Sequence, residues 1–252
     1  MRTDHRGYFS DTDTSAISQR NTDDQQQIMR NQKMIKKQVS NCLTAFGFSK
    51  KRETLFTRFK KDIVEYFVLE HPPGLFYFNY CIYPLFMPPM EFLSLNIGNR
   101  IDHSQNNPEM IISNDATPED MDIWCARASD FICKDVELFA QKVDPVKKMI
   151  LFLEREECFP LPLRSIVWIN YQSRFEILMF AYLYVHDYIK AREAASGYLG
   201  EIDTPKHGMI VREKGRACYN HVIELAELAD DQIVDQEMEK WREKNIKFFG
   251  TR

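Results

Sequence analysis

The tripeptide Gly98-Asn99-Arg100 ends an apolar stretch of the chain and could bind an anion. An arginine at the end of a strand holds a carboxylate or a phosphate through two parallel hydrogen bonds, and Asn99 could assist it. A Gly-Asn pair is also typical of a tight turn, because both residues tolerate the left-handed backbone region. We favour the second interpretation, in which the tripeptide closes a sheet and Arg100 pairs with an acid such as Glu70 or Glu91.

Glu65 is a second candidate, since it lies among apolar and aromatic residues. A buried carboxyl group has a raised pKa and can act as a general acid or base. The sequence places no second carboxyl group or histidine beside Glu65, so we favour a position at a sheet edge or a pairing with Arg58 or Thr57. The ligand- or partner-binding residues that the sequence predicts are Glu65, Asn79, Tyr80, Asn99 and Arg100.

Cys218 and His221 are spaced so that a helix places both side chains on one face, where each could ligate a metal ion. Two ligands do not complete a metal site, and the position of His207, a candidate third ligand, does not follow from the sequence. We therefore expect no metal. The chain also contains no G-x-S-x-G, H-E-x-x-H, G-x-G-x-x-G or P-loop motif, so we expect no catalytic residues and no cofactor.

The basic stretch KKRETLFTRFKK, residues 50–61, surrounds two phenylalanines with lysines and arginines. It could contact nucleic acid or an acidic protein. We favour a hairpin whose lysines protect a sheet edge from pairing with other chains. The net charge of −4 argues against nucleic acid as the partner.

The composition is that of a globular protein with a large core. The chain has 252 residues, of which 44% are hydrophobic, 13% aromatic and 28% charged. Its six cysteines form no C-x-x-C pair, its N-terminus lacks the apolar segment of a signal peptide, and no apolar stretch is long enough to cross a membrane. We expect reduced thiols, a cytoplasmic protein and no membrane partner.

The hydrophobic pattern predicts an α+β fold. After a flexible polar tail at 1–27, a helix begins at Ile28 and ends at Gly47. Four strands follow at 53–59, 63–70, 75–83 and 91–97, and their short connections predict an antiparallel sheet. Pairing the second strand with the third puts Glu65 on the same face as Tyr80. Both faces are apolar enough to need a cover, unless one of them is a binding surface.

The rest of the chain is predicted to be helical. A linker loop at 102–116 precedes a helix that starts at Thr117-Pro118. Further helices are expected from Pro145 and at 211–247. Residues 173–202 resemble one helical hairpin of the tetratricopeptide type, but only one such unit is present, so we favour an αα-hairpin that packs on the core. The sequence thus divides into an α+β subdomain at 28–101 and a helical subdomain at 117–252 that covers one face of the sheet.

Residues 42–101 resemble a family of small uncharacterised bacterial proteins. The resemblance rests on Gly47-Phe48, the hairpin at 53–70, the strand from Phe78 to Pro84-Leu85-Phe86, and the ending Gly98-Asn99-Arg100-Ile101. Proteins of this kind are described as domains of unknown function. The resemblance therefore implies the fold of this region and a bacterial cytoplasmic origin, but no activity and no site residues.

These observations favour a non-enzymatic protein that binds another protein. A toxin-neutralising immunity protein is the most specific form of this expectation, since such a protein needs only a face of complementary shape and charge. The alternative is a small-ligand-binding protein or an enzyme, with a site on the sheet face near Glu65 and Arg100.

Overall fold

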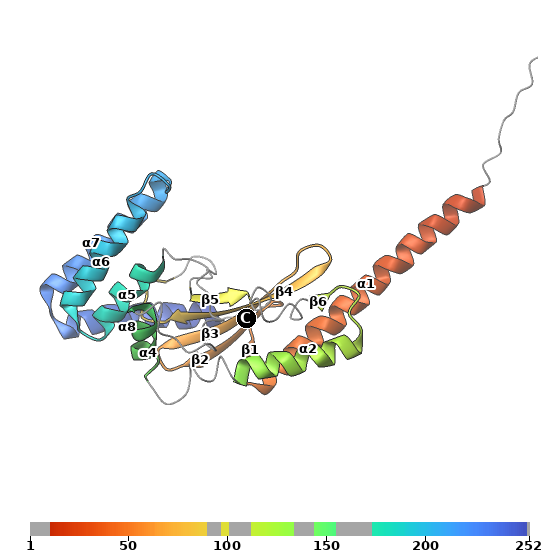
Figure 1. Cartoon of the computed structure of the whole chain (residues 1–252), viewed down its shortest axis with the longest axis horizontal. Coiled ribbons are helices and arrows are strands. Elements are labelled where there is room, and N and C mark those ends of the chain that lie inside the picture. The colour runs from red at the N-terminus through yellow and green to blue at the C-terminus, as the bar shows by residue number, and fades with distance from the viewer. Residues whose placement is uncertain (1–10, 90–96, 101–111, 134–143, 155–172, 251–252) are drawn as a thin grey trace, which may run out of the picture.

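The computed structural model describes residues 11–89, 97–100, 112–133, 144–154 and 173–250. It confirms an α+β fold, with a helix first, an antiparallel sheet next and a helical C-terminal half (Figure 1). The helices are α1 (Asp11–Ala45), α2 (Pro118–Phe131), α4 (Pro145–Glu154), α5 (Ser173–Tyr184), α6 (Tyr188–Ile202), α7 (Met209–Leu228) and α8 (Asp231–Gly250). The strands are β1 (Ser49–Lys50), β2 (Leu55–Lys60), β3 (Ile63–Glu70), β4 (Leu75–Pro84), β5 (Ile97–Arg100) and β6 (Ile112–Ser113).

The sheet has the strand order β1-β2-β3-β4-β5, and every neighbouring pair is antiparallel. The strands predicted at 53–59, 63–70 and 75–83 are confirmed as β2, β3 and β4. Each connecting turn contains one residue with positive φ, Lys61 at 49° and Gly74 at 89°. The short β6, inside the predicted linker at 102–116, pairs with the start of β4. That segment is therefore tied to the sheet.

The tripeptide Gly98-Asn99-Arg100 belongs to a strand, so its interpretation as a turn was wrong. It forms β5 together with Ile97, and Gly98 lies opposite Cys81 of β4 in the register. The reason lies in β4, a long strand from Leu75 to Pro84. One side of its backbone pairs with β3, and the other side can form hydrogen bonds with a further strand. Most of the strand predicted at 91–97 lies outside the described residues.

The two sheet faces are covered by different helices. Glu65 shares a face with Tyr80, as predicted from the pairing of β3 with β4. On this face Phe48, just after α1, packs on Phe67 with ring centroids 4.9 Å apart, and Trp124 of α2 packs on Phe78 at 4.4 Å.

The opposite face of the sheet packs on the C-terminal helix. Phe249 of α8 lies 5.3 Å from Tyr66 and 5.8 Å from Tyr83, measured between ring centroids. The helical half is thus divided between both faces, whereas the sequence predicted that it covers one. The division follows from the strands themselves, because residues on both of their faces are buried and apolar.

Helix α1 starts at Asp11, so residues 11–27, predicted as a flexible tail, are helical. Apolar residues in its second half anchor the helix, since Ile35, Val39 and Leu43 are buried. The first half extends beyond the body of the molecule (Figure 1). Its polar composition carries no hydrophobic period, which is why the sequence pattern did not predict it. Gly47, with φ 80°, ends the helix as predicted.

The helical half contains two consecutive hairpins. The predicted αα-hairpin at 173–202 is confirmed as α5 and α6, and the buried Ala191 and Ala195 of α6 permit close packing. The predicted helix at 211–247 is instead two helices, because Ala229 adopts a left-handed conformation with φ 46°. Within the described ranges, no helix combines the length and the apolar character needed to cross a membrane.

Asn245 of α8 fixes this helix to the end of β4. Its buried side-chain amide donates hydrogen bonds to the carbonyl oxygens of Leu85 and Met87, both 2.8 Å long.

We expect Asn245→Leu to lower the free energy of unfolding in urea by about 2–4 kcal/mol, since two buried acceptors lose their donor. Asn220→Leu, at an exposed position of α7, serves as the control, and an equal loss there would contradict this role of Asn245.

Candidate functional site

Glu65 and Tyr80, two of the predicted site residues, form a buried polar network with Arg58. The Arg58 Nε donates to one carboxylate oxygen of Glu65 at 2.7 Å, and the Tyr80 hydroxyl donates to the other at 3.0 Å. Glu65 is fully buried, and the Arg58 residue is only 9% exposed. The pairing of Glu65 with Arg58, one of the structural alternatives for this acid, is confirmed.

Arg58 also joins this network to the end of α1. Its Nη1 donates to the carbonyl oxygen of Phe46 at 2.8 Å, and its guanidinium lies 4.5 Å from the centroid of the Phe48 ring. Burial, and secondly the negative charge of Glu65, raise the pKa of Tyr80 well above its ordinary value. Both oxygens of Glu65 accept hydrogen bonds from Arg58 and Tyr80. We therefore assign this carboxylate a structural role in the sheet.

The other predicted site residues do not join this network. Asn79 precedes Tyr80 in β4 and therefore faces the opposite side of the sheet. It is 1% exposed, and its Nδ2 finds no hydrogen-bond partner among the described residues. In the register, Asn99 lies opposite Tyr80, and Arg100 lies opposite Asn79. The structure thus brings the backbone of all five residues into one region of the sheet but divides Glu65 and Asn79 between its two faces. The side chains of Asn99 and Arg100 lie outside the described part, so the ion pair expected for Arg100 stays a prediction.

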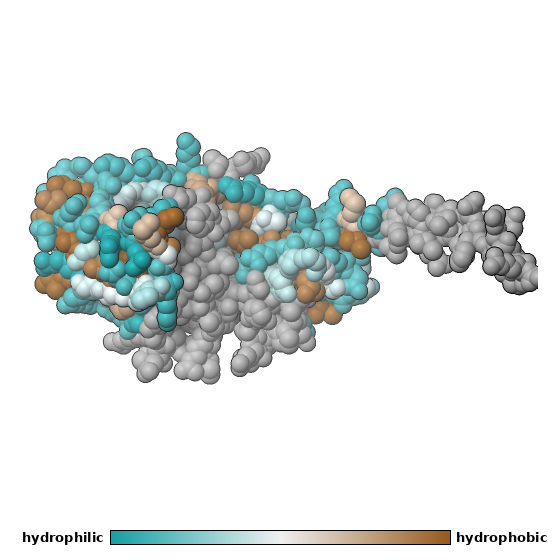
Figure 2. All heavy atoms as spheres, turned by 90° about the horizontal axis from the view of Figure 1, so that it is seen from above, coloured by the Kyte–Doolittle hydropathy of each residue, from teal (hydrophilic) through white to brown (hydrophobic). Residues whose placement is uncertain are grey.

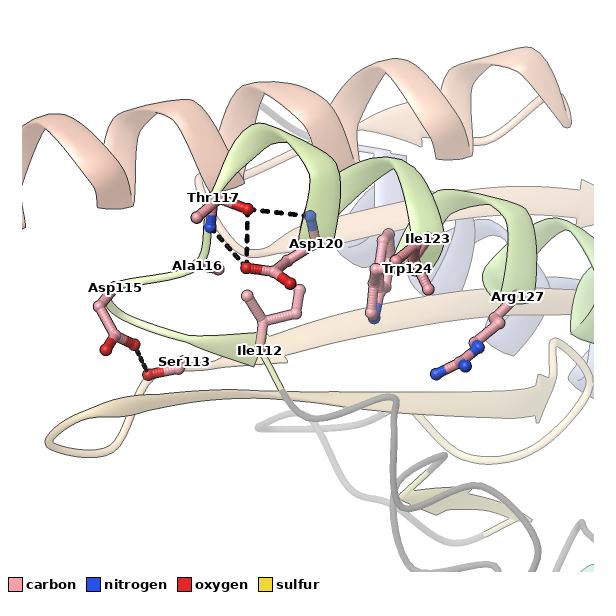
Figure 3. A pocket seen from close by; sticks show the side chains of 9 residues that line it. All are labelled: Ile112, Ser113, Asp115, Ala116, Thr117, Asp120, Ile123, Trp124 and Arg127. Carbon is pink, nitrogen blue, oxygen red and sulfur yellow. Dashed lines mark hydrogen bonds between the residues drawn. The ribbon is translucent and has the colours of Figure 1, made fainter.

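A cavity of about 610 Å³ lies between β6 and α2. Figure 3 shows the side chains of Ile112 and Trp124 entering it from β6 and α2, with the guanidinium of Arg127 further along the helix. The side chain of Ile123, also in α2, is half exposed at its border. The cavity is therefore lined by both apolar and polar side chains, with two acidic groups and one basic group, and its described lining includes none of the predicted site residues.

The acidic residues of this cavity have structural partners. The backbone N–H of Thr117 donates to the Asp120 carboxylate at 2.8 Å, and the Asp120 N–H donates to the Thr117 hydroxyl at 3.2 Å (Figure 3). This capping box confirms the helix start that the sequence predicts at Thr117. The Ser113 hydroxyl donates to Asp115 in the same way. The carboxylates of Asp115 and Asp120 thus accept hydrogen bonds from neighbouring residues at and just before the start of α2, and we assign them a structural role.

Glu176 of α5 is a titratable group that the sequence analysis missed. Burial raises the pKa of its carboxyl group to about 7. The negative charge of Glu176 is one of the causes that raise the pKa values of the Tyr83, Tyr198 and Cys218 side chains, although burial is the larger cause for each of them. The helical spacing of α5 could have revealed this acid, since Glu176 lies one position before the buried run from Ile177 to Leu183.

The side chains of Cys218 and His221, the two candidate metal ligands, have different surroundings. Burial raises the pKa of the Cys218 thiol to about 12. His221 lies beside Trp241, with ring centroids 5.6 Å apart, and its Nε2 is 3.9 Å from a Glu237 oxygen. Within the described ranges, no group of three histidine, cysteine or acidic side chains is placed to hold a metal ion.

In comparisons with known proteins, no protein-family model, no curated protein and no solved structure matches the chain. The resemblance of residues 42–101 to a bacterial family therefore stays a prediction, and the functional argument rests on the geometry of this chain.

The buried network gives a sharp stability test. Arg58→Met leaves the Glu65 carboxylate buried without its cation, so we expect the free energy of unfolding to fall by about 3–5 kcal/mol. Adding Glu65→Leu removes the stranded charge and should restore most of that loss. The measurement is urea denaturation of both single variants and of the double variant. If the double variant lost the sum of the two single effects, the charges would not be coupled.

Glu176 predicts an unusual dependence of stability on pH. Its pKa is about 7 in the folded chain and 4.5 in the unfolded chain. The folded state therefore binds more protons between these values, and stability falls as the pH rises through this window. Glu176→Gln should match the parent protein near pH 4.5 and be more stable by about 2–3 kcal/mol at pH 8. The exposed Glu193→Gln is the control, and a constant difference between parent and Glu176→Gln across the pH range would refute the assignment.

Proposed function

We propose that the protein is a non-enzymatic interaction module that binds another protein through the tip where α6 meets α7. The observation that carries this proposal is the start of α7, where three consecutive large apolar residues are exposed. Met209 is 65% exposed, Ile210 67% and Val211 51%. Single exposed apolar residues are ordinary, but an apolar group at a protruding end is a frequent feature of protein-binding surfaces.

The tip has a geometry that suits a binding surface. The α6–α7 hairpin extends away from the sheet (Figure 1), and apolar residues emerge among polar ones over this end of the molecule (Figure 2). The two helices are packed closely, because Gly215 faces Ile202, and a Cβ at Gly215 would lie only 2.2 Å from its Cδ1. An ion pair of 2.7 Å between Arg216 and Asp203 also joins them. A surface held in this way loses little conformational entropy on binding.

Small-ligand binding on the sheet is the second candidate function. Asn79 favours it, because its buried amide Nδ2 has no partner within the described part of the chain and Arg100 lies opposite it in the register. Such a site would use the face of Asn79 and not Glu65, whose carboxylate belongs to the other face. A thermal-shift screen of small carboxylates and phosphates tests this function, with Asn79→Ala and Arg100→Ala each expected to abolish any stabilisation.

The test of the main proposal is affinity capture from the cells that produce the protein, with Ile210→Glu as the variant. A glutamate near a helix N-terminus is electrostatically favourable, so this variant should fold while its apolar contact is lost. We expect one partner at near-equal amount with the parent protein and its loss with Ile210→Glu. Leu228→Glu, at an exposed apolar position at the far end of α7, is the matched control and should keep the partner.

Two results would contradict the proposal. One is an identical set of captured proteins for the parent and Ile210→Glu. The other is a homodimer of the parent protein in sedimentation that Ile210→Glu dissociates, since the tip would then serve self-association. Toxin neutralisation is the particular form of partner binding that we propose to test next, by adding the protein to its captured partner and measuring whether the partner's toxicity falls.

A further inference from the structure

A groove on the second half of α1 is lined by four lysines. It has a volume of about 580 Å³ and lies between α1 and the segment that contains β1. The described residues that line it are Met29, Gln32, Lys33, Lys36, Lys37, Ser40, Asn41, Lys50 and Glu53.

The lysines are held in place by the packing of the helix on the sheet. Lys33, Lys36 and Lys37 follow each other at helical spacing and so project from one side of α1. Ile35 and Val39, on the other side of α1, are fully buried in the core. Lys50 comes from β1, which pairs with β2. The backbone positions of the four lysines around the groove are therefore fixed by the fold.

These charges are largely without acidic partners. Lys36 pairs with Glu53, and this contact lowers the pKa of the Glu53 carboxyl group. Lys33, Lys37 and Lys50 are exposed, and no ion pair joins them to a carboxylate within the described part of the chain. The sequence segment 25–61 contains ten basic residues and one acidic residue, although the whole chain has a net charge of −4. Four of these basic residues line the groove, whereas Arg58 is buried against Glu65 and Lys61 lies beside Asp62.

We propose that this groove binds a short acidic segment of a partner protein, in which aspartate or glutamate residues are interspersed with apolar ones. The carboxylates would pair with Lys33, Lys37 and Lys50, which form no ion pair within the described residues, although the charge of Lys50 also acts on Glu53. Apolar side chains would lie on Met29, which is 69% exposed at one end of the groove, and on the methylene stems of the lysines.

Two observations favour an acidic peptide over nucleic acid. A nucleic acid is a long polyanion that would run from the groove onto the acidic remainder of the chain, whereas a short peptide contacts only the groove. None of the described lining residues is aromatic, so the groove offers no ring on which the bases of a single strand could stack.

This binding site is separate from the apolar tip of α7. The groove lies on α1, and the tip lies at the opposite end of the molecule, beyond the sheet (Figure 1). The two proposals therefore fail or succeed independently. Ile210→Glu should leave peptide binding at the groove unchanged.

The experiment uses fluorescence anisotropy with the full chain and a short labelled peptide that repeats the sequence Glu-Glu-Leu. A peptide with glutamine in place of glutamate and a DNA duplex are the comparison probes. We expect saturable binding of the acidic peptide that weakens as salt is added. The double variant Lys33→Gln/Lys37→Gln should bind it about tenfold more weakly. The control Lys206→Gln/Lys214→Gln removes the same charge at exposed lysines near the tip and should bind like the parent protein.

The proposal is overturned if the acidic peptide shows no saturable binding, or if the glutamine peptide binds as well. It is also overturned if both double variants lose the same affinity, because the effect would then come from overall charge. Tighter binding of the DNA duplex than of the peptide would assign the groove to nucleic acid instead.

Discussion

The buried ion pair between Arg58 and Glu65 is the interaction on which the arrangement of the N-terminal half depends. A charged carboxylate can be removed from water only if its oxygens receive donors of good geometry. Here the donors come from β2 and β4 on either side of β3, and the same guanidinium also reaches the carbonyl oxygen of Phe46 at the end of α1. A shift of any one strand by one residue would move its contribution to the opposite face. The pair therefore specifies the register of three strands and the position of the first helix together.

This requirement also determines where function can lie. Both faces of the sheet are apolar, and each is covered by helices, α1 and α2 on one side and α8 on the other. Several polar groups in the interior form hydrogen bonds that hold the elements together, as Glu65, Tyr80 and the amide of Asn245 illustrate. Among the described residues, the Nδ2 of Asn79 and the hydroxyl of Thr57 are buried polar groups without a hydrogen-bond partner. The two surfaces that we propose for other molecules lie at the two ends, on α1 and at the α6–α7 tip.

Local chemistry made much of the fold predictable. The alternation of side chains between two faces predicts the central strands and the shared face of Glu65 and Tyr80. The hydroxyl group of Thr117 and the carboxyl group of Asp120 indicate the start of α2. Features that depend on distant packing were missed. The strand at Gly98 exists because β4 offers a free side to pair with, and the burial of Glu176 depends on which helices pack against α5. The apolar run that follows Glu176 marks this acid as a candidate, but the neighbouring residues alone determine neither its burial nor the pairing of β5 with β4.

The two proposed surfaces differ in kind, and the fold explains why they can be separate. Lys33 and Lys37 on α1 are exposed to water and attract opposite charge, whereas Ile210 and its neighbours contribute binding free energy when water is excluded. A sheet with a buried ion pair joins these ends, and such a network has one satisfied arrangement rather than two. Coupling between distant sites requires an element with two discrete arrangements that both sites bias. Because the connecting sheet is held in one arrangement, occupation of the groove on α1 should leave the affinity of the α7 tip for its partner unchanged.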